Sequence, residues 1–155
     1  MRIALVAYDA AMPGEKGLAR ISYLAALFCR YGYEVDLITS GFQHWEKRPR
    51  TAEEIARARA SLPCRVTFID QPGYTKNIQL RRIWSYRILA KNILAHLEAN
   101  EYDLVYSLIP DNHTAALAGD YAKRKSIPFI IDVEDLWPEA MRMVLDVPVV
   151  SDVLF

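Results

Sequence analysis

Arg2-Ile-Ala-Leu-Val-Ala-Tyr8 is a short, almost entirely apolar stretch that decides the fold. An unbroken apolar run of this length is typical of a strand that is buried on both faces in a parallel sheet. The chain has 155 residues, of which 52% are hydrophobic and 25% charged, a size and composition typical of one globular domain. The sequence therefore indicates a single domain with this strand in its core.

Four further stretches have the pattern of strands, and segments of helical periodicity separate them. This alternation predicts an α/β fold, a Rossmann-like parallel sheet of five or more strands joined by right-handed crossovers, with helices on both faces. The predicted strands are 2–8, 34–39, 65–70, 103–109 and 129–133, and the predicted helices are 17–31, 51–61, 76–99 and 111–125.

Three local signals set helix boundaries. Gly32 suits the left-handed position that ends a helix. Thr51 and Glu54 have the form of a capping box, which opens a short helix within the otherwise polar and irregular stretch 41–63. The helix that ends at Lys125 carries three basic residues in its last turn, where they complement the negative end of the helix dipole.

Candidate binding residues follow the strands, because ligands of an open parallel sheet bind outside the carboxyl ends of its strands. The first such loop contains Gly14, Lys16 and Gly17 and leads into a helix whose free N–H groups can receive an anion. The loop matches neither GxGxxG nor a P-loop, so a plain connecting loop is an equal alternative.

The loop after the fifth strand is the richest in functional groups. It contains Asp132, Glu134, Asp135 and Trp137. Carboxylates this close together repel one another, so without basic partners their pKa values rise, which makes the loop a candidate site. A carboxylate pair can orient sugar hydroxyls or act as a base, and an aromatic ring beside it can stack on a sugar. In the alternative interpretation, Asp135 caps the following helix and Trp137 packs in the core.

The loop after the fourth strand supplies Asp111, Asn112 and His113, which are candidates for contact with a polar ligand. For His113, an exposed residue at the start of a helix is the favoured alternative. The other histidines, His44 and His96, share no metal-ligand spacing with it, so we expect no metal.

The sequence predicts a cytoplasmic protein. Its opening apolar run is too short for a signal peptide, and no apolar run reaches the roughly 18 residues that span a bilayer. Net charge is zero, but residues 41–100 carry eleven Lys and Arg against five Asp and Glu (+6), whereas residues 101–155 carry four against ten (−6). Such asymmetry can mark a basic surface for phosphate or anionic lipid, or an ordinary solvated face. We expect no nucleic-acid partner.

The predicted helix 76–99 is basic and amphipathic, with Arg82, Arg87 and Lys91 on its flanks. Peripheral contact with an anionic membrane at the inner face of the cell membrane is one interpretation, and a solvated helix face is the other. Its polar stripe consists of Arg81, Ser85, Asn92 and His96, and its apolar surface of Leu80, Ile83, Trp84, Ile88 and Leu94.

The sequence resembles the glycosyltransferases of family 4 with the GT-B fold, particularly those of bacterial capsule and exopolysaccharide synthesis. The resemblance rests on 3–6, 31–39, 102–107 and above all Ile131-Asp-Val-Glu-Asp-Leu-Trp-Pro-Glu139. It implies that residues 1–155 are the amino-terminal, acceptor-side domain, that a second Rossmann-like domain absent from this chain binds the nucleotide sugar, and that transfer needs no metal or other cofactor.

The resemblance also implies roles for individual residues. The first loop, with Gly14, Lys16 and Gly17, approaches the donor phosphates. Glu134, followed by Asp135, stands where many members have a catalytic histidine. Acceptor contacts fall to Asp111, Asn112, His113, Asp132 and Trp137. The intact protein is then expected to transfer a sugar from a nucleotide sugar to a lipid-linked or glycan acceptor, and the isolated chain to be inactive.

Two other functions fit parts of the sequence. A non-catalytic partner subunit that completes a separate transferase polypeptide keeps the resemblance. A receiver-like signalling domain matches the acids at Asp9 and Asp70 and the hydroxyl at Ser107, but the lysine that it needs on the fifth strand is missing.

Overall fold

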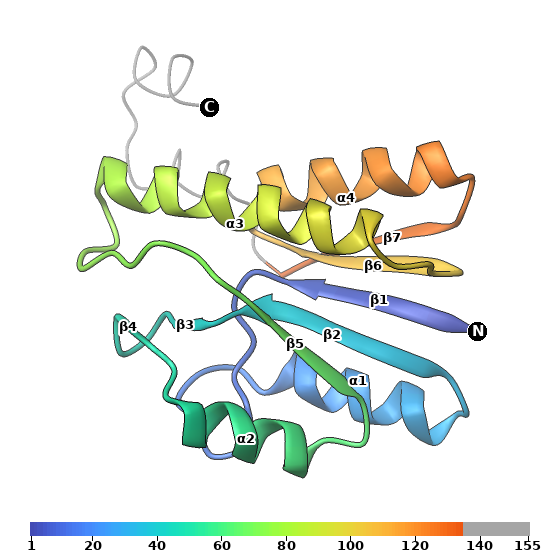
Figure 1. Ribbon diagram of the computed structural model, residues 1–155, viewed down its shortest axis with the longest axis horizontal. Coiled ribbons are helices and arrows are strands. Elements are labelled where there is room, and N and C mark those ends of the chain that lie inside the picture. Colours follow the sequence, from blue (N-terminus) through green and yellow to red (C-terminus); the bar gives the residue numbers. More distant parts are fainter. Residues whose placement is uncertain (135–155) are drawn as a thin grey trace.

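A computed structural model of the chain describes residues 1–134 (Figure 1). Strands and helices alternate around a five-stranded parallel sheet, which confirms the predicted α/β fold. The elements are β1 (Arg2–Ala7), α1 (Arg20–Arg30), β2 (Glu34–Ser40), β3 (Phe42–Gln43), β4 (Arg48–Pro49), α2 (Ala52–Ser61), β5 (Arg65–Ile69), α3 (Leu80–Glu98), β6 (Leu104–Ile109), α4 (Asn112–Lys125) and β7 (Phe129–Val133).

The strand order of the sheet is β5-β2-β1-β6-β7. In chain order these are the third, second, first, fourth and fifth main strands, which is the Rossmann arrangement. The receiver-like alternative is wrong, because in that architecture the first and third strands are neighbours. Here β2 lies between β1 and β5, so Asp9 and Asp70, which follow those strands, are two strands apart.

The helices form two layers, α1 and α2 on one face of the sheet and α3 and α4 on the other (Figure 1). The central strand β1 contributes to both cores because successive side chains of a strand point to opposite faces. Ala4 and Val6 pack with residues of α3 and α4, whereas Leu5 and Ala7 pack with residues of α1 and α2. All four are 0% exposed, so the strand is buried on both faces as predicted.

Local signals set several boundaries correctly. Thr51 and Glu54 form the predicted capping box at the start of α2, and Gly32 follows α1 with φ +83°. Two helices start later than predicted, α1 at Arg20 and α3 at Leu80. For α1 the reason is Gly17, whose φ of +124° is incompatible with a helix. The small hairpin of β3 and β4 was not predicted.

Part of the polar stripe of α3 holds the loop between β5 and α3, whose backbone carbonyls need donors. Arg81 donates to Gly73 O at 2.7 Å, Ser85 to Pro72 O at 2.5 Å and Asn92 to Asp70 O at 2.9 Å. Ser85 is buried, whereas Arg81 and Asn92 are exposed, in agreement with a solvated helix face at those two positions. The stripe therefore fixes the loop while its outer residues keep contact with solvent.

The fourth residue of that stripe, His96, belongs to a buried polar network around Asp36. The Asp36 carboxylate accepts hydrogen bonds from Tyr102 Oη at 2.7 Å and Thr67 Oγ1 at 2.7 Å, and His96 Nε2 lies 3.1 Å from Oδ2. Asp36 is 1% exposed. A buried carboxylate is tolerated only when such partners replace its water, so this network joins β2, β5 and α3.

Replacing Tyr102 with Phe tests the network. The Tyr102→Phe variant should lose about 2 kcal/mol of unfolding free energy, because one hydrogen bond to a buried charged group is removed. Urea denaturation at pH 7 measures the change. Tyr31→Phe, at a ring that is 73% exposed, is the control and should leave stability unchanged. Equal stability of both variants would contradict the assigned role.

Candidate functional site

The strand order reverses at β1, so the loops after β1 and β6 lie at the switch point of the sheet. The chain moves from β1 outward through β2 to β5, then returns to the other side of β1 to form β6 and β7. At this reversal the loops after β1 and β6 diverge and leave room for a ligand. Tyr8 and Asp9 follow β1, and Asp111 follows β6. These loops, with the neighbouring β3–β4 hairpin and the start of α3, form the candidate site.

Arg50 fixes the loop after β1. Its side chain is fully buried and binds both carboxylate oxygens of Glu15 at 2.8 Å. The same guanidinium donates to Ser40 O at 2.6 Å and to Ala10 O at 2.9 Å. Glu15 in turn accepts a hydrogen bond from Met12 N at 3.0 Å. One buried ion pair therefore joins the loop after β1 to the end of β2.

Asp9 lies beside this ion pair with an unusual affinity for protons. Burial raises the pKa of Asp9 to about 6, although the positive charges of Arg50 and Lys47 and a hydrogen bond from the backbone N–H of His44 oppose the shift. The negative charge of Glu15 adds to the rise. A carboxyl group with a pKa near neutrality suits proton transfer at physiological pH.

A chain of hydrogen-bonded side chains lies beside Asp9. Arg82 donates to Tyr86 Oη at 3.1 Å, Tyr86 Oη lies 3.3 Å from Tyr74 Oη, and Tyr74 Oη lies 2.6 Å from His44 Nδ1. Lys47 donates to the backbone carbonyl of His44. Burial, together with the positive charges of Lys47 and Arg82, lowers the pKa of His44 to about 4, so the imidazole is neutral at pH 7.

These groups offer three chemical functions in one place. Asp9 can accept or donate a proton, Lys47 and Arg82 carry positive charge for a phosphate, and the half-buried ring of Tyr86 can contact a sugar, whereas Tyr74 is buried. Tyr8 packs against Tyr86 with ring centroids 5.5 Å apart. We call Asp9, His44, Lys47, Tyr74, Arg82 and Tyr86 the switch-point cluster. Neither His44 nor Lys47 was predicted as a site residue, because both lie in a stretch without periodicity.

The predicted phosphate loop is only partly open to a ligand. Gly14 has φ +88° and nothing within 4 Å of the position of a Cβ, so its backbone can be approached. A Cβ on Gly17 would lie 2.7 Å from Trp45 Nε1, so this glycine is needed for packing. Lys16 is exposed. The N-cap residue of α1, Ala19, provides no side-chain hydrogen bond to the first turn.

The acids at the end of β7 have a basic partner. Arg20, in the first turn of α1, pairs with Asp132 at 2.5 Å and with Glu134 at 3.0 Å. Burial favours a raised pKa for Asp132, but hydrogen bonds from Arg20 and Tyr106 hold that pKa below its ordinary value. The crowding that would raise the pKa is therefore offset here. Asp135 and Trp137 lie outside the described residues.

Asp111 is the N-cap of α4, so its carboxylate accepts hydrogen bonds from the first turn of its own helix. It is 5% exposed and accepts hydrogen bonds from Thr114 N at 3.3 Å and Thr114 Oγ1 at 2.5 Å. His113 is exposed at the start of the helix, in agreement with the favoured alternative. Asn112 lies instead at a groove between α4 and β7.

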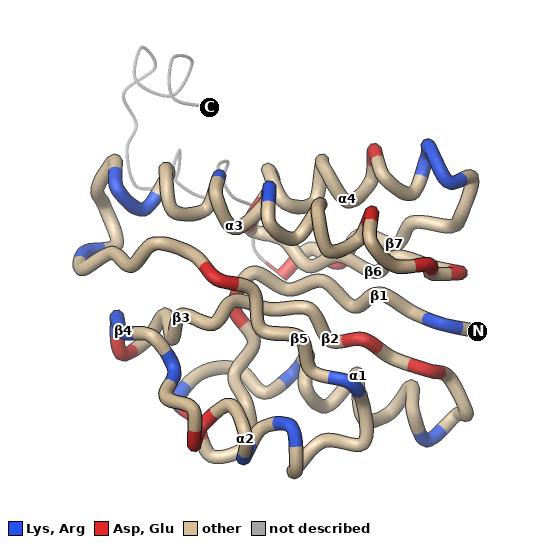
Figure 2. Tube along the Cα trace, viewed as in Figure 1, with Lys and Arg blue, Asp and Glu red and all other residues tan. Residues whose placement is uncertain are grey.

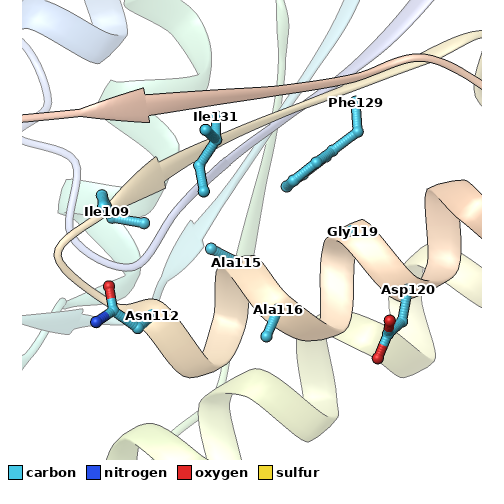
Figure 3. Close-up of a pocket in the computed structure, with 8 residues that line it drawn as sticks. All are labelled: Ile109, Asn112, Ala115, Ala116, Gly119, Asp120, Phe129 and Ile131. Carbon is cyan, nitrogen blue, oxygen red and sulfur yellow. The ribbon is translucent and has the colours of Figure 1, made fainter. Parts of the chain in front are cut away.

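That groove has a volume of about 340 Å³ and is mainly apolar (Figure 3). It lies between α4 and β7, on the outer side of β6 from the switch-point cluster, and we assign no ligand to it. Within residues 1–134, no three His, Cys, Asp or Glu side chains are grouped so that they can hold a metal ion. The groove between α4 and β7 is lined by Ile109, Asn112, Ala115, Ala116, Gly119, Asp120, Phe129 and Ile131.

Comparison with known proteins identifies the fold but no family. No family model matches the chain, and no curated protein matches it. The structure is similar to the C-terminal domain of a hydrogenase from Pyrococcus furiosus (TM-score 0.56, 18% identity, 84% of this chain and 89% of that domain). It is also similar to the glycotransferase of kitacinnamycin (TM-score 0.57, 18% identity, 97% of this chain).

The chain spans 34% of the length of that glycotransferase. The fold therefore resembles a glycosyltransferase domain, while the hydrogenase domain shows that proteins with other names share it. A fold of this kind supports many functions, so function has to be argued from the site.

The Arg50–Glu15 pair generates a stability prediction. Arg50→Ala should lower the free energy of unfolding by about 3–5 kcal/mol, because it leaves the carboxylate of Glu15 in a buried place without its charge partner. Thermal and urea unfolding measure this loss. Arg57→Ala on the exposed face of α2 is the matched control and should be nearly neutral. A loss at Arg50 no larger than at Arg57 would contradict the role.

Asp9 generates a prediction that depends on pH. Because the folded protein raises its pKa from 3.8 to about 6, the unfolded chain ionises first as the pH rises, and the native state loses stability between pH 4 and 6. Asp9→Asn removes this penalty. The variant should be more stable above pH 6, by at most about 3 kcal/mol, and the difference should vanish below pH 4.

Urea unfolding at pH 7.5 and at pH 3.5 measures the two limits. Asp120→Asn, at an exposed position of α4, should show no pH-dependent difference from the unmodified protein. An Asp9→Asn variant that is destabilised at pH 7.5 would overturn the assignment of an unfavourable carboxylate.

Proposed function

We propose that this chain is the acceptor-side domain of a glycosyltransferase that transfers a sugar from a nucleotide sugar to a lipid-linked or glycan acceptor in cell-surface polysaccharide synthesis. The observation that carries the proposal is the switch-point cluster, in which a carboxyl group with a near-neutral pKa lies beside two cations and two tyrosine rings. The resemblance of the sequence to family 4 and the similarity of the fold to a glycotransferase support it.

Asp9 is the proposed proton acceptor. The oxygen of the acceptor hydroxyl attacks the anomeric carbon of the donor sugar, and the bond between that carbon and the phosphate oxygen breaks. The nucleoside diphosphate leaves with the bonding electron pair, and the hydroxyl proton passes to the carboxylate of Asp9. Lys47 and Arg82 are placed to offset phosphate charge, and the ring of Tyr86 to contact the sugar or acceptor.

The remaining predicted residues have supporting roles in the proposal. Gly14, Lys16 and Gly17 approach the donor phosphates from the loop after β1. Asp132, held by Arg20, and Trp137 are proposed acceptor contacts, and Glu134 and Asp135 are the alternative catalytic residues to Asp9. Asp111, Asn112 and His113 border the other flank. A second domain that binds the nucleotide sugar completes the enzyme.

Assembly with a second domain is the first test. The 155-residue chain alone should not transfer sugar from a panel of UDP-sugars and GDP-sugars to a short-chain prenyl phosphate. A longer chain, or a second polypeptide that supplies the nucleotide-sugar domain, should be active. A fully active 155-residue chain would refute the half-enzyme proposal, and an assembled protein inactive on every pair would refute the reaction.

Asp9→Asn in the assembled protein tests the site. Loss of a positioned base should lower kcat by about 100-fold to 10,000-fold. Asp120→Asn is the control, since it exchanges the same groups at an exposed position outside the cluster. Measuring kcat alongside stability matters here, because the same substitution is expected to strengthen folding. If Asp9→Asn and Glu134→Gln both retain full activity, the chain is a non-catalytic partner subunit instead.

A further inference from the structure

The start of α3 exposes a group of large apolar side chains. Ile78 is 87% exposed, Leu80 84%, Ile83 55% and Trp84 51%. The loop before α3 and its first two turns bring these four residues within seven positions of one another. A single exposed apolar residue is ordinary on a protein surface, but a contiguous group of large ones marks an interaction surface.

The same segment is uniformly basic. Between Asp70 and Glu98 the sequence contains no acidic residue and five Lys and Arg. Figure 2 shows the basic positions spaced along α3, with the acidic ones only before the helix and at its end. The surface therefore combines apolar insertion with positive charge. The cations of the segment are Lys76, Arg81, Arg82, Arg87 and Lys91. Arg81 and Arg82 are hydrogen-bonded to the loop before α3 and to Tyr86, whereas, within residues 1–134, Lys76, Arg87 and Lys91 are exposed with no such contact to the loop or the cluster.

One side of α3 packs against the domain and the other side is exposed. Ser85, Leu89 and Ile93 are buried against the sheet and the loop after β5. Leu80, Ile83 and Trp84 of the first turns stay in solvent, and Arg87 and Lys91 extend the exposed side toward the carboxyl end. The exposed side is thus apolar first and basic afterwards, while the buried side alone fixes the helix to the domain.

We infer that the exposed side of α3, from Ile78 to Lys91, binds the surface of an anionic membrane. The inserted groups are the apolar side chains at its start, and the cations that follow contact lipid phosphates. Binding of this kind needs both contributions, since neither a few apolar side chains nor a few charges hold a protein at a bilayer. No helix within residues 1–134 is long and apolar enough to cross a bilayer.

Charge favours a lipid surface over a protein partner. Lysine is depleted in protein interfaces, whereas Lys and Arg beside Trp and Leu are typical of helices that lie on anionic membranes. The tryptophan ring, with its apolar body and polar N–H, suits the level of the headgroups. A protein partner would need acids to match Lys76, Arg87 and Lys91, since the sequence between Asp70 and Glu98 has no acidic residue of its own.

Membrane contact would place the switch-point cluster at the headgroup level. Arg82 lies on the same helix turn as Ile83 and Trp84, and it reaches Tyr86 in the cluster at 3.1 Å. This consequence rests on the proposed function, because a lipid-linked acceptor would then meet the cluster without leaving the membrane. The membrane binding itself does not depend on it.

Vesicle co-sedimentation tests the inference with the 155-residue chain. The protein should bind vesicles of phosphatidylcholine containing phosphatidylglycerol, and bind at least about tenfold less to pure phosphatidylcholine, because both signals are needed. Leu80→Ser with Trp84→Ser should reduce binding about tenfold, and Arg87→Glu with Lys91→Glu should do the same and remove its salt dependence.

Matched controls are Leu18→Ser, at a residue 71% exposed before α1, and Lys123→Glu at the exposed end of α4. Both should bind as the unmodified protein does. Absence of binding to anionic vesicles, or equal binding by all variants, would overturn the inference and indicate that a protein surface covers these residues. Asp9→Asn should bind vesicles normally, so failure of the transferase proposal and failure of this one are distinguishable.

Discussion

The buried guanidinium of Arg50 is the constraint on which the site depends. The loop after β1 is twelve residues long, from Tyr8 to Ala19, and contains two glycines with positive φ. Its local sequence therefore restricts the backbone conformation only weakly. The path of the loop is fixed instead by the ion pair of Arg50 with Glu15 and by the hydrogen bonds that Arg50 donates to Ser40 O and Ala10 O. Because the charges of Arg50 and Glu15 are both removed from water, the ion pair is favourable only if its geometry is closely maintained. Asp9 lies beside this arrangement, and burial raises its pKa against the opposing charge of Arg50.

The fold was largely predictable because its signals are local. The apolar run of β1, the glycine after α1 and the capping box of α2 each act over a few residues, and each is present in the structure. The strand order was not predicted in detail, and together with the lysine missing from the fifth strand it separates the Rossmann arrangement from a receiver. Pairing between strands distant in sequence leaves little trace in any one segment, so periodicity could not supply it.

The site was predicted only in outline. The position of the candidate residues at the carboxyl edge of the sheet was predictable, since Asp9, Asp111, Asp132 and Glu134 all lie there. The partners of these residues were missed. Arg20 and Arg50 come from segments 112 and 41 residues away from the acids Asp132 and Asp9, and no spacing rule links residues so far apart. The loop contacts of the polar stripe of α3 were missed for a related reason, because the carbonyls that it satisfies belong to a loop whose path depends on tertiary contacts.

The raised pKa of Asp9 has a consequence for anyone engineering this domain. Thermal selection rewards any exchange that removes a disfavoured charge, whatever the charge does for the protein. A library screened only for heat resistance would therefore enrich replacements of Asp9, together with changes that loosen the switch-point cluster around it. The substitutions that such a screen accepts most readily would mark the groups that the native protein keeps at the expense of its own stability.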